Sequence, residues 1–303
     1  APVITLGEGN TPLVTKKVLG SDVGFKLEGL NPTGSFKDRL TAIEISFLQS
    51  LGITQAVEDS SGNAGASFAA YAASAGIDGT VYVPDYASGP KRHQIEAYGQ
   101  EIIMVPGPRS AAGLAVMEAV AKGANYASHA YLPIGTPGYA TIAYELVAQM
   151  GQAPGTVISP VGHGSLLQGI ILGFEALMKR KIIQNMPHFV GMQARACAPL
   201  WLRKTMGEAA LEELEEGETL AEGVRVMHPI RGDALIKLSE KYSVDILAVT
   251  EENIMLGKRT LAKMGMYVEP TSAIVWEGIL FANENTPPPS VAILTGSGLK
   301  SLK

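Results

Sequence analysis

Short runs of β-branched residues alternate along this chain with longer alanine-rich segments, and this alternation restricts the possible folds more than any other feature. Such runs favour β-strands at Gly79–Val83, Glu101–Val105, Thr156–Pro160, His188–Met192 and Val291–Leu294. Between them, apolar residues recur at helical spacing in Phe36–Leu51, Ala64–Ala75, Ala111–Lys122, Tyr139–Met150, Leu166–Arg180, Glu251–Met264 and Ser272–Asn283. We therefore predict parallel βαβ units and an α/β fold in which helices flank mostly parallel sheets.

Length and charge limit the kinds of partner. With 303 residues, of which 46% are hydrophobic, the chain is long enough for two domains of ordinary size. The net charge of -5 provides no basic surface, so we expect no nucleic acid partner. No apolar run approaches the roughly 20 residues that cross a bilayer, and Ala1–Asn10 lacks the pattern of a secretory leader. We expect a cytoplasmic protein without membrane contact.

Cysteine and histidine give no sign of a disulfide or a metal. Cys197 is the single cysteine, so it has no partner for an internal disulfide. The five histidines are scattered at positions 93, 129, 163, 188 and 228, without metal-ligand spacing. We therefore expect no metal site.

One lysine follows a turn in the segment NPTGSFKDR, Asn31–Arg39. Ser35 with Asp38 three residues later has the pattern of a capping box, which places Lys37 in the first turn of a helix. The free N–H groups and the positive end of the helix dipole there disfavour the ammonium form. A neutral amine can bond to an aldehyde and later act as a base. A surface lysine after a well-made cap is the alternative interpretation.

The segment SSGNAG, Ser60–Gly65, leads from a strand into an alanine-rich helix. Its backbone N–H groups and the Asn63 amide are expected to point into one space, where they can bind a carboxylate or a ring oxygen. An ordinary strand-to-helix turn with Asn63 as its cap remains the alternative.

A second loop suits a phosphate, because it follows a strand and opens a long helix. Its residues are Gly162, His163, Gly164, Ser165 and Leu166. A dinucleotide fingerprint is a poor alternative, since Leu167 occupies the position of the third glycine. The next strand also runs into Gln193 rather than into an acidic residue.

Near the C-terminal end, LTGSGLK (Leu294–Lys300) places Thr295 directly after a strand. Open α/β sheets bind ligands at the carboxyl ends of their strands. A hydroxyl there can hydrogen-bond a neutral pyridine nitrogen, whereas an aspartate would keep that nitrogen protonated. A purely structural threonine is the alternative.

Together with GEGNTPL (Gly7–Leu13) and EPTSA (Glu269–Ala273), these segments resemble the threonine synthase branch of the fold-type II pyridoxal 5'-phosphate (PLP) enzymes, the tryptophan synthase beta superfamily. The motifs occur in the order of that family across nearly the whole chain. The resemblance implies PLP as cofactor, with Lys37 as the Schiff-base lysine. It also implies that Asn63 lies at the 3'-oxygen, that Thr295 binds the pyridine nitrogen, and that Gly162, His163, Gly164, Ser165 and Leu166 hold the phosphate.

The same resemblance implies an organisation and an activity. Residues 1–40 and 139–303 would form a large PLP-binding domain, residues 41–138 a small mobile domain inserted in it, and two chains a homodimer. The substrate would be a small amino acid whose carboxylate is held by Ser60, Ser61 and Asn63 and whose α-proton is removed by Lys37. The implied carbon–oxygen lyase reaction, in amino-acid biosynthesis, converts O-phosphohomoserine and water to threonine and phosphate.

The segment LPIGTPGYAT departs from the family. Gly135 and Ala140 stand where threonine synthases carry an arginine and a lysine that help to hold the substrate phosphate. Lys91, Arg92 and His93 can either replace that charge or form a helix surface. A threonine or serine dehydratase, or a cysteine-synthase-like elimination or replacement enzyme, is therefore an alternative. A non-catalytic protein that binds PLP or an amino acid is a third.

Overall fold

The computed structural model describes residues 3–86 and 89–301 and consists of two compact units. Unit 1 comprises Ala1–Gly9, Leu30–Gly138 and Leu299–Lys303, and unit 2 comprises Asn10–Gly29 and Tyr139–Gly298. The assignment of residues 41–138 to a small mobile domain stays a prediction.

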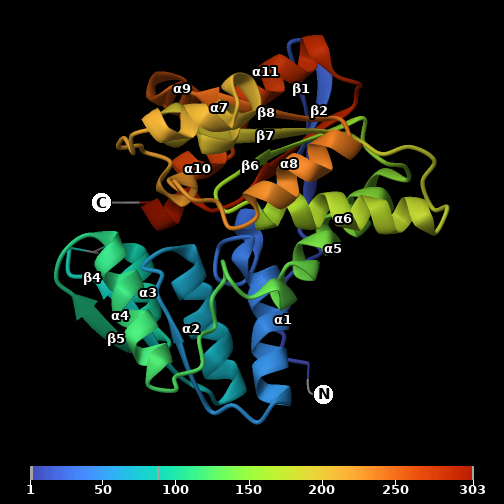
Figure 1. Cartoon of the computed structure of the whole chain (residues 1–303). Helices are drawn as coiled ribbons and strands as arrows, with labels where there is room; N and C mark the ends of the chain where they lie inside the picture. Colours follow the sequence, from blue (N-terminus) through green and yellow to red (C-terminus); the bar gives the residue numbers. More distant parts are fainter. Residues whose placement is uncertain (1–2, 87–88, 302–303) are drawn as a thin grey trace. The chain divides into compact units, whose positions relative to one another are not determined.

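Unit 1 contains a parallel three-stranded sheet in the order β3-β4-β5. Its strands are β3 (Gln55–Glu58), β4 (Asp78–Pro84) and β5 (Glu101–Val105). Its helices are α1 (Lys37–Ser50), α2 (Asn63–Ala75), α3 (Pro90–Ala97), α4 (Arg109–Ala121) and the 3-10 turn η2 (Pro133–Gly135). Helices α1 and α2 run side by side (Figure 1), and their apolar faces meet the sheet in a core that includes Ile45, Phe68 and Val81.

A short segment extends this sheet beyond β3. Val57 donates its N–H to Asn125 O at 2.8 Å and accepts at its carbonyl from Ala127 N at 2.9 Å. Val57 and Tyr126 thus form a parallel bridge. Residues 125–127 run beside β3 in the same direction, so the chain that follows them continues past the carboxyl end of β3.

Unit 2 contains a six-stranded sheet in the order β1-β2-β9-β6-β7-β8. Strand β1 (Leu13–Val18) pairs with β2 (Ser21–Leu27) in antiparallel orientation, and the other neighbours are parallel. The parallel strands that follow are β6 (Thr156–Pro160), β7 (His188–Ala194), β8 (Val244–Val249) and β9 (Ser290–Leu294). Every residue of β6 and β9 is buried, as expected of strands covered on both faces.

Helices cover both faces of this larger sheet (Figure 1). A side chain at Gly191 of β7 would meet Leu167 of α6, whereas Met192 approaches Gly278 of α11, so these helices lie on opposite faces. The helices are α5 (Pro137–Met150), α6 (Ser165–Lys179), α7 (Pro199–Met206), α8 (Gly232–Lys241), α9 (Glu251–Lys263), α10 (Pro270–Ala273) and α11 (Val275–Asn285). The 3-10 turns are η1 (Glu28–Leu30), η3 (Arg195–Cys197), η4 (Glu208–Glu213) and η5 (Glu222–Val224); a further turn, η6 (Gly298–Ser301), begins at the last residue of unit 2 and continues in unit 1.

The predicted architecture is confirmed: parallel sheets are flanked by helices, and each predicted strand lies within an observed one. Strands β1, β2, β3 and β8 lie outside the predicted ranges, although the strand expected before Ser60 corresponds to β3. Strand β1 is missed because three of its residues, beginning at Thr15, are exposed, so no continuous apolar run marks it. The single helix predicted for Ser272–Asn283 is wrong, since the chain forms α10 and α11 with Ile274 between them.

The predicted capping box at Ser35 is also wrong. The residue before α1 is Phe36, with no side-chain cap, and the Ser35 hydroxyl is buried without a hydrogen-bond partner among the described residues. Asp38 instead accepts hydrogen bonds from Thr33 and Ser67. One partner lies in the turn before the helix and the other in a second helix, so the local spacing of residues does not reveal these hydrogen bonds.

Within the described part of the chain, we find no helix of sufficient length and apolar character to cross a lipid bilayer.

Candidate active site

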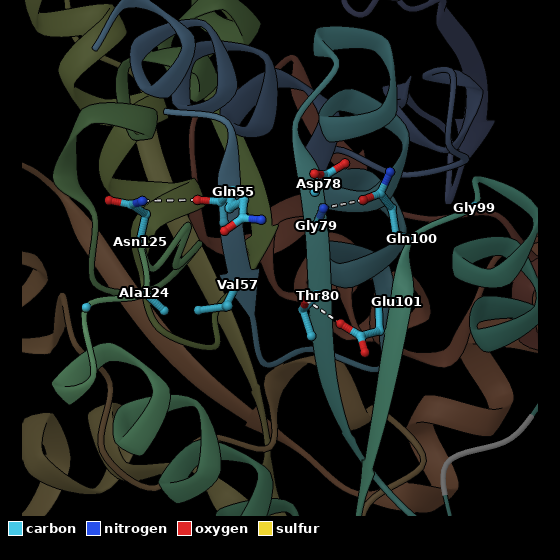
Figure 2. Close-up of a pocket in the computed structure, with 12 residues that line it drawn as sticks. Gln55, Val57, Asp78, Gly79, Thr80, Gly99, Gln100, Glu101, Ala124 and Asn125 are labelled. Carbon is cyan, nitrogen blue, oxygen red and sulfur yellow. Dashed lines mark hydrogen bonds between the residues drawn. The ribbon is translucent and has the colours of Figure 1, made fainter. Parts of the chain in front are cut away.

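Two hollows lie at the amino ends of the strands. The one in unit 1 is lined by Gln55, Asp78 and Glu101, which begin β3, β4 and β5 (Figure 2). The one in unit 2 is lined by residues 151–155, 182–188, 241–243 and 287–289, which precede the parallel strands. Open α/β sheets bind ligands at the carboxyl ends of their strands, so neither hollow lies where an active site is expected.

Lys37 is the first residue of α1, as predicted. The first turn of α1 is anchored by Asp38, whose carboxylate accepts from the backbone N–H of Thr33 at 2.7 Å and from its hydroxyl at 2.6 Å. Asp38 also accepts from the Ser67 hydroxyl at 2.6 Å. Because Ser67 lies one turn after the start of α2, this bond ties the beginnings of α1 and α2 together.

The predicted anion loop lies between β3 and α2. Gly62 precedes the helix and Asn63 is its first residue, so Asn63 is not the cap. The Ser60 hydroxyl accepts from Gly62 N at 3.2 Å. A side chain at Gly65 would come within 1.8 Å of Ser60 O, so only glycine allows the loop to fold this closely onto α2. Ser60, Ser61 and Asn63 thus lie at the same end of unit 1 as the start of α1.

A cluster of ionisable side chains lies directly before this loop. His129 Nδ1 is 2.5 Å from Glu58 Oε1. Asp59 accepts from Arg109 Nη2 at 2.8 Å and from the Tyr126 hydroxyl at 2.7 Å. These partners meet because residues 125–127 run beside β3 and carry His129 past its carboxyl end. Sequence spacing did not reveal the cluster, since 71 residues separate Glu58 from His129.

Burial sets the protonation of these groups. Desolvation, and then the charge of Asp59, raise the pKa of Glu58 well above its usual value. Desolvation, and then the charge of Lys37, lower the pKa of His129 to about 3. Both directions favour a neutral pair, so the short contact is a hydrogen bond between an acid and an imidazole rather than an ion pair. Burial opposes ionisation of Asp59 too, but Arg109 and Tyr126 hold its pKa below the ordinary value.

A second buried carboxyl, Glu44, lies on α1. Desolvation raises its pKa well above the usual value, an ionised Glu58 would raise it further, and the charge of Lys37 acts in the opposite direction. A side chain at Gly135 would come within 2.8 Å of Glu44 Cγ. The position expected to carry an arginine is therefore occupied by a glycine against a buried acid.

Glu58, Asp59 and His129 are also near enough to one another to be considered as metal ligands, since their ligand atoms lie within 4.8 Å. Arg109 already pairs with Asp59, and a guanidinium at that distance disfavours a second cation. We assign no metal to this group.

In unit 2, the predicted phosphate loop follows β6 and opens α6. Gly164 precedes α6 with φ +94°, and a side chain there would come within 2.8 Å of Leu235 Cδ1. Ser165 and Leu166 form the first turn, where backbone N–H groups have no partner within the helix. His163 accepts at its carbonyl from Arg231 N at 2.9 Å, which fixes the loop. Gly162 lies close to the backbone of Gly223.

Thr295 follows β9, the strand that pairs with β6, so it lies at the same edge of the sheet as the glycine loop. It is 1% exposed, and its hydroxyl is 2.9 Å from the Ser272 hydroxyl. Ser272 also accepts from Gly296 N at 2.8 Å. The EPTSA motif contains Ser272, but its sequence does not indicate that Ser272 positions Thr295.

The remaining candidates lie on α3 and α5. Lys91, Arg92 and His93 are on α3, where Arg92 pairs with Glu96 four residues later, as on an ordinary helix surface. Ala140 is buried in α5. Neither segment supplies a cation that these observations connect to the loops described above.

Comparison with known proteins identifies the family. The model of the pyridoxal-phosphate dependent enzymes matches residues 4–296. Threonine synthase from Synechocystis sp. is 32% identical over 309 residues, which cover 99% of this chain and 79% of that protein. Threonine synthase from Methanocaldococcus jannaschii is 32% identical over 315 residues, with 98% and 76% coverage.

Solved structures share the fold. Maize serine racemase superposes with a TM-score of 0.80 at 21% identity, covering 95% of this chain and 88% of that one. The threonine deaminase of T.th. gives a TM-score of 0.73 at 26% identity, with 95% and 92% coverage.

Proposed function

Since this chain belongs to the pyridoxal-phosphate dependent enzymes, which makes it a PLP-dependent lyase, we propose that it is a threonine synthase that converts O-phosphohomoserine and water to threonine and phosphate. The observation that carries this proposal is the similarity, over almost the whole chain, to threonine synthases that are 31–33% identical.

The chemistry of the residues fits the cofactor. The loop from Gly162 to Leu166 lies at a helix start, where N–H groups and the helix dipole favour a phosphate. Gly164 has a backbone conformation and a close neighbour that exclude a larger residue. In our proposal these five residues hold the cofactor phosphate, Thr295 binds the ring nitrogen and Asn63 the 3'-oxygen.

Ser272 gives Thr295 its role in this proposal. The Ser272 hydroxyl has one proton and two acceptors for it, Thr295 Oγ1 at 2.9 Å and the Gly296 carbonyl at 3.2 Å. When it donates to Thr295 Oγ1, the Thr295 proton is available to a neutral ring nitrogen. A neutral hydroxyl does not keep that nitrogen protonated, so the ring withdraws electrons less strongly than a protonated ring would.

Lys37 is proposed to hold the cofactor covalently and, once released by the substrate, to take the α-proton on Nζ. When bound, PLP withdraws electrons from the carbon atoms of the attached amino acid and so makes that proton acidic. Ser60, Ser61 and Asn63 are proposed to hold the substrate carboxylate, since a helix start favours an anion. We also propose a cytoplasmic homodimer; light scattering on the purified protein can test the dimer.

The test is product analysis on the purified enzyme loaded with PLP. Incubation with O-phosphohomoserine is expected to release inorganic phosphate and threonine in equal amounts. Absence of phosphate release, together with a 2-oxo acid formed from serine or threonine, would overturn the proposal.

That contrary result would support a dehydratase, or a β-elimination or β-replacement enzyme of the cysteine-synthase kind. One observation favours this second candidate: Gly135 lies against the buried Glu44, and Ala140 is apolar, so neither position supplies a cation for a phosphate.

A further inference from the structure

Glu58 is a buried acid with one oxygen that lacks a hydrogen-bond partner. It is the last residue of β3, 0% exposed, and two positions before the Ser60 loop. Its Oε1 contacts His129 Nδ1 at 2.5 Å, whereas Oε2 has no hydrogen-bond partner among the described residues. A buried polar atom without a partner costs folding free energy and is typical of functional sites.

The position of the Glu58 proton depends on the tautomer of His129, and we take the tautomer with its hydrogen on Nδ1. Burial raises the pKa of Glu58 and lowers that of His129, so both groups are neutral. A neutral imidazole that carries its hydrogen on Nδ1 donates to Oε1. With that tautomer the carboxyl proton lies on Oε2, the oxygen that has no hydrogen-bond partner among the described residues.

The acidity of Glu58 also depends on Lys37. The positive charge of Lys37 lowers the pKa of Glu58, in the same direction as that of Arg109. If Lys37 gains a proton from the substrate, the nearby carboxyl therefore becomes a stronger acid at the same moment. Proton uptake by Lys37 therefore favours proton release by Glu58, as an elimination requires.

We propose that Glu58 is the general acid that protonates the departing oxygen of the substrate. This inference rests on the proposed function, because it takes Lys37 as the base. The C–H bond that breaks in this step adjoins the carbon that carries the oxygen: it is Cβ–H for the γ-phosphate of O-phosphohomoserine and Cα–H for a β-substituent. Lys37 Nζ receives that proton, and the electron pair of the bond becomes a carbon–carbon double bond. The C–O bond breaks with its pair on oxygen, and the Oε2 proton of Glu58 moves to that oxygen. The carboxylate that remains is stabilised by the His129 N–H.

The other acids of the cluster are less suited to this role. Asp59 is ionised, because Arg109 and Tyr126 bind its carboxylate, and so has no proton to give. Glu44 is protonated, but it lies on α1 and has no imidazole to stabilise the anion. It provides a matched comparison: a second buried carboxyl in the same unit.

The test compares Glu58→Gln with Glu44→Gln in the PLP-loaded enzyme. Two rates are measured on the substrate that the wild-type enzyme turns over: deuterium uptake at Cα from heavy water by NMR, and release of phosphate or 2-oxo acid. Glu58→Gln is expected to keep deuterium uptake within a few-fold while product release falls about 100- to 10,000-fold. Glu44→Gln is expected to retain product release within about ten-fold.

Infrared spectroscopy supplies a readout that does not depend on turnover. The spectrum of the wild-type protein should contain two carbonyl bands of protonated buried carboxyls, one from Glu58 and one from Glu44. Glu58→Gln should remove the first band and keep the second, and Glu44→Gln should do the reverse. An ionised Glu58 at neutral pH would overturn the inference.

Equal losses of deuterium uptake and product release in Glu58→Gln would also overturn it, since the residue would then support Lys37 or the fold. Failure of the proposed function is distinguishable, because the wild-type enzyme itself would then release no phosphate from O-phosphohomoserine.

Discussion

The two units differ in the kind of group that they offer for chemistry. The candidate groups of unit 1 are ionisable side chains whose pKa values are shifted by burial, such as Glu58, Asp59 and His129. Those of unit 2 are backbone N–H groups at the start of α6 and a hydroxyl after β9. Substitution of one side chain can remove a catalytic group from unit 1. A site made of backbone N–H groups is instead lost when a substitution changes the backbone conformation. The two units should therefore respond differently to substitution.

The largest effect is expected for the amine of unit 1. Lys37→Arg keeps a positive charge but cannot bond to the cofactor or act as a base, so turnover should fall about 10,000-fold or more. Borohydride reduction of the PLP-loaded wild-type protein, followed by peptide mass analysis, should label position 37. Lys122→Arg, at the exposed end of α4, is the control and should keep both label and turnover. A label on any other lysine contradicts the prediction.

In unit 2 the sensitive position is a glycine. Gly164→Ala combines an unfavourable φ of +94° with a contact at 2.8 Å, which should cost about 1–3 kcal/mol. PLP affinity should fall about 5- to 150-fold, since 1.4 kcal/mol is about ten-fold. Gly207→Ala is the matched control, because its φ is +90° but nothing lies within 4 Å. The control should lose stability without losing PLP affinity; equal losses of affinity in both variants would refute the role of the loop.

A smaller effect is expected for the hydroxyl pair. Thr295→Ala and Ser272→Ala each remove a neutral hydrogen bond and should weaken PLP binding by about 0.5–1.5 kcal/mol. Because Ser272 acts through Thr295, the double variant should cost less than the sum of the single ones, with a coupling of about 0.5 kcal/mol or more. Fluorescence titration with PLP measures all three variants. Strict additivity would show that the two hydroxyls act independently.

The smallest effect is expected at the surface of unit 2, where Glu175 binds Lys241 at 2.6 Å and the lysine is 57% exposed. The bond to Lys241 lowers the pKa of Glu175 to about 2. Because the pKa of Glu175 is lower in the folded state, its ionised form stabilises the fold at pH values above the ordinary pKa near 4.5. This stabilisation is lost as the pH falls toward about 2. Glu175→Gln should lower the free energy of unfolding by less than about 1 kcal/mol at pH 7. Urea titrations should show the difference shrinking in acid; a constant difference would refute the assignment.

Local patterns in the sequence were sufficient for several elements of both units. Lys37 was predicted in the first turn of a helix, and α1 begins at that residue. Strand β6, the glycine loop and α6 also follow one another as predicted. Such features are set by neighbours in the chain: apolar periodicity, a turn before a helix, and glycine where the backbone requires it. The reason given for the start of α1 was nevertheless wrong, because Asp38 binds Thr33 and Ser67 rather than completing a cap.

The sequence by itself determined the alternation of strands and helices, the family, and the positions of Lys37, Gly164 and Thr295 at the ends of elements. Only the tertiary structure brought Glu58 to His129 and Ser272 to Thr295, across 71 and 23 residues. These side chains meet because of the order of the strands in each sheet, and local sequence propensities do not predict that order. Burial, which shifts the pKa of Glu58 and His129, is likewise a property of the packed unit rather than of either residue.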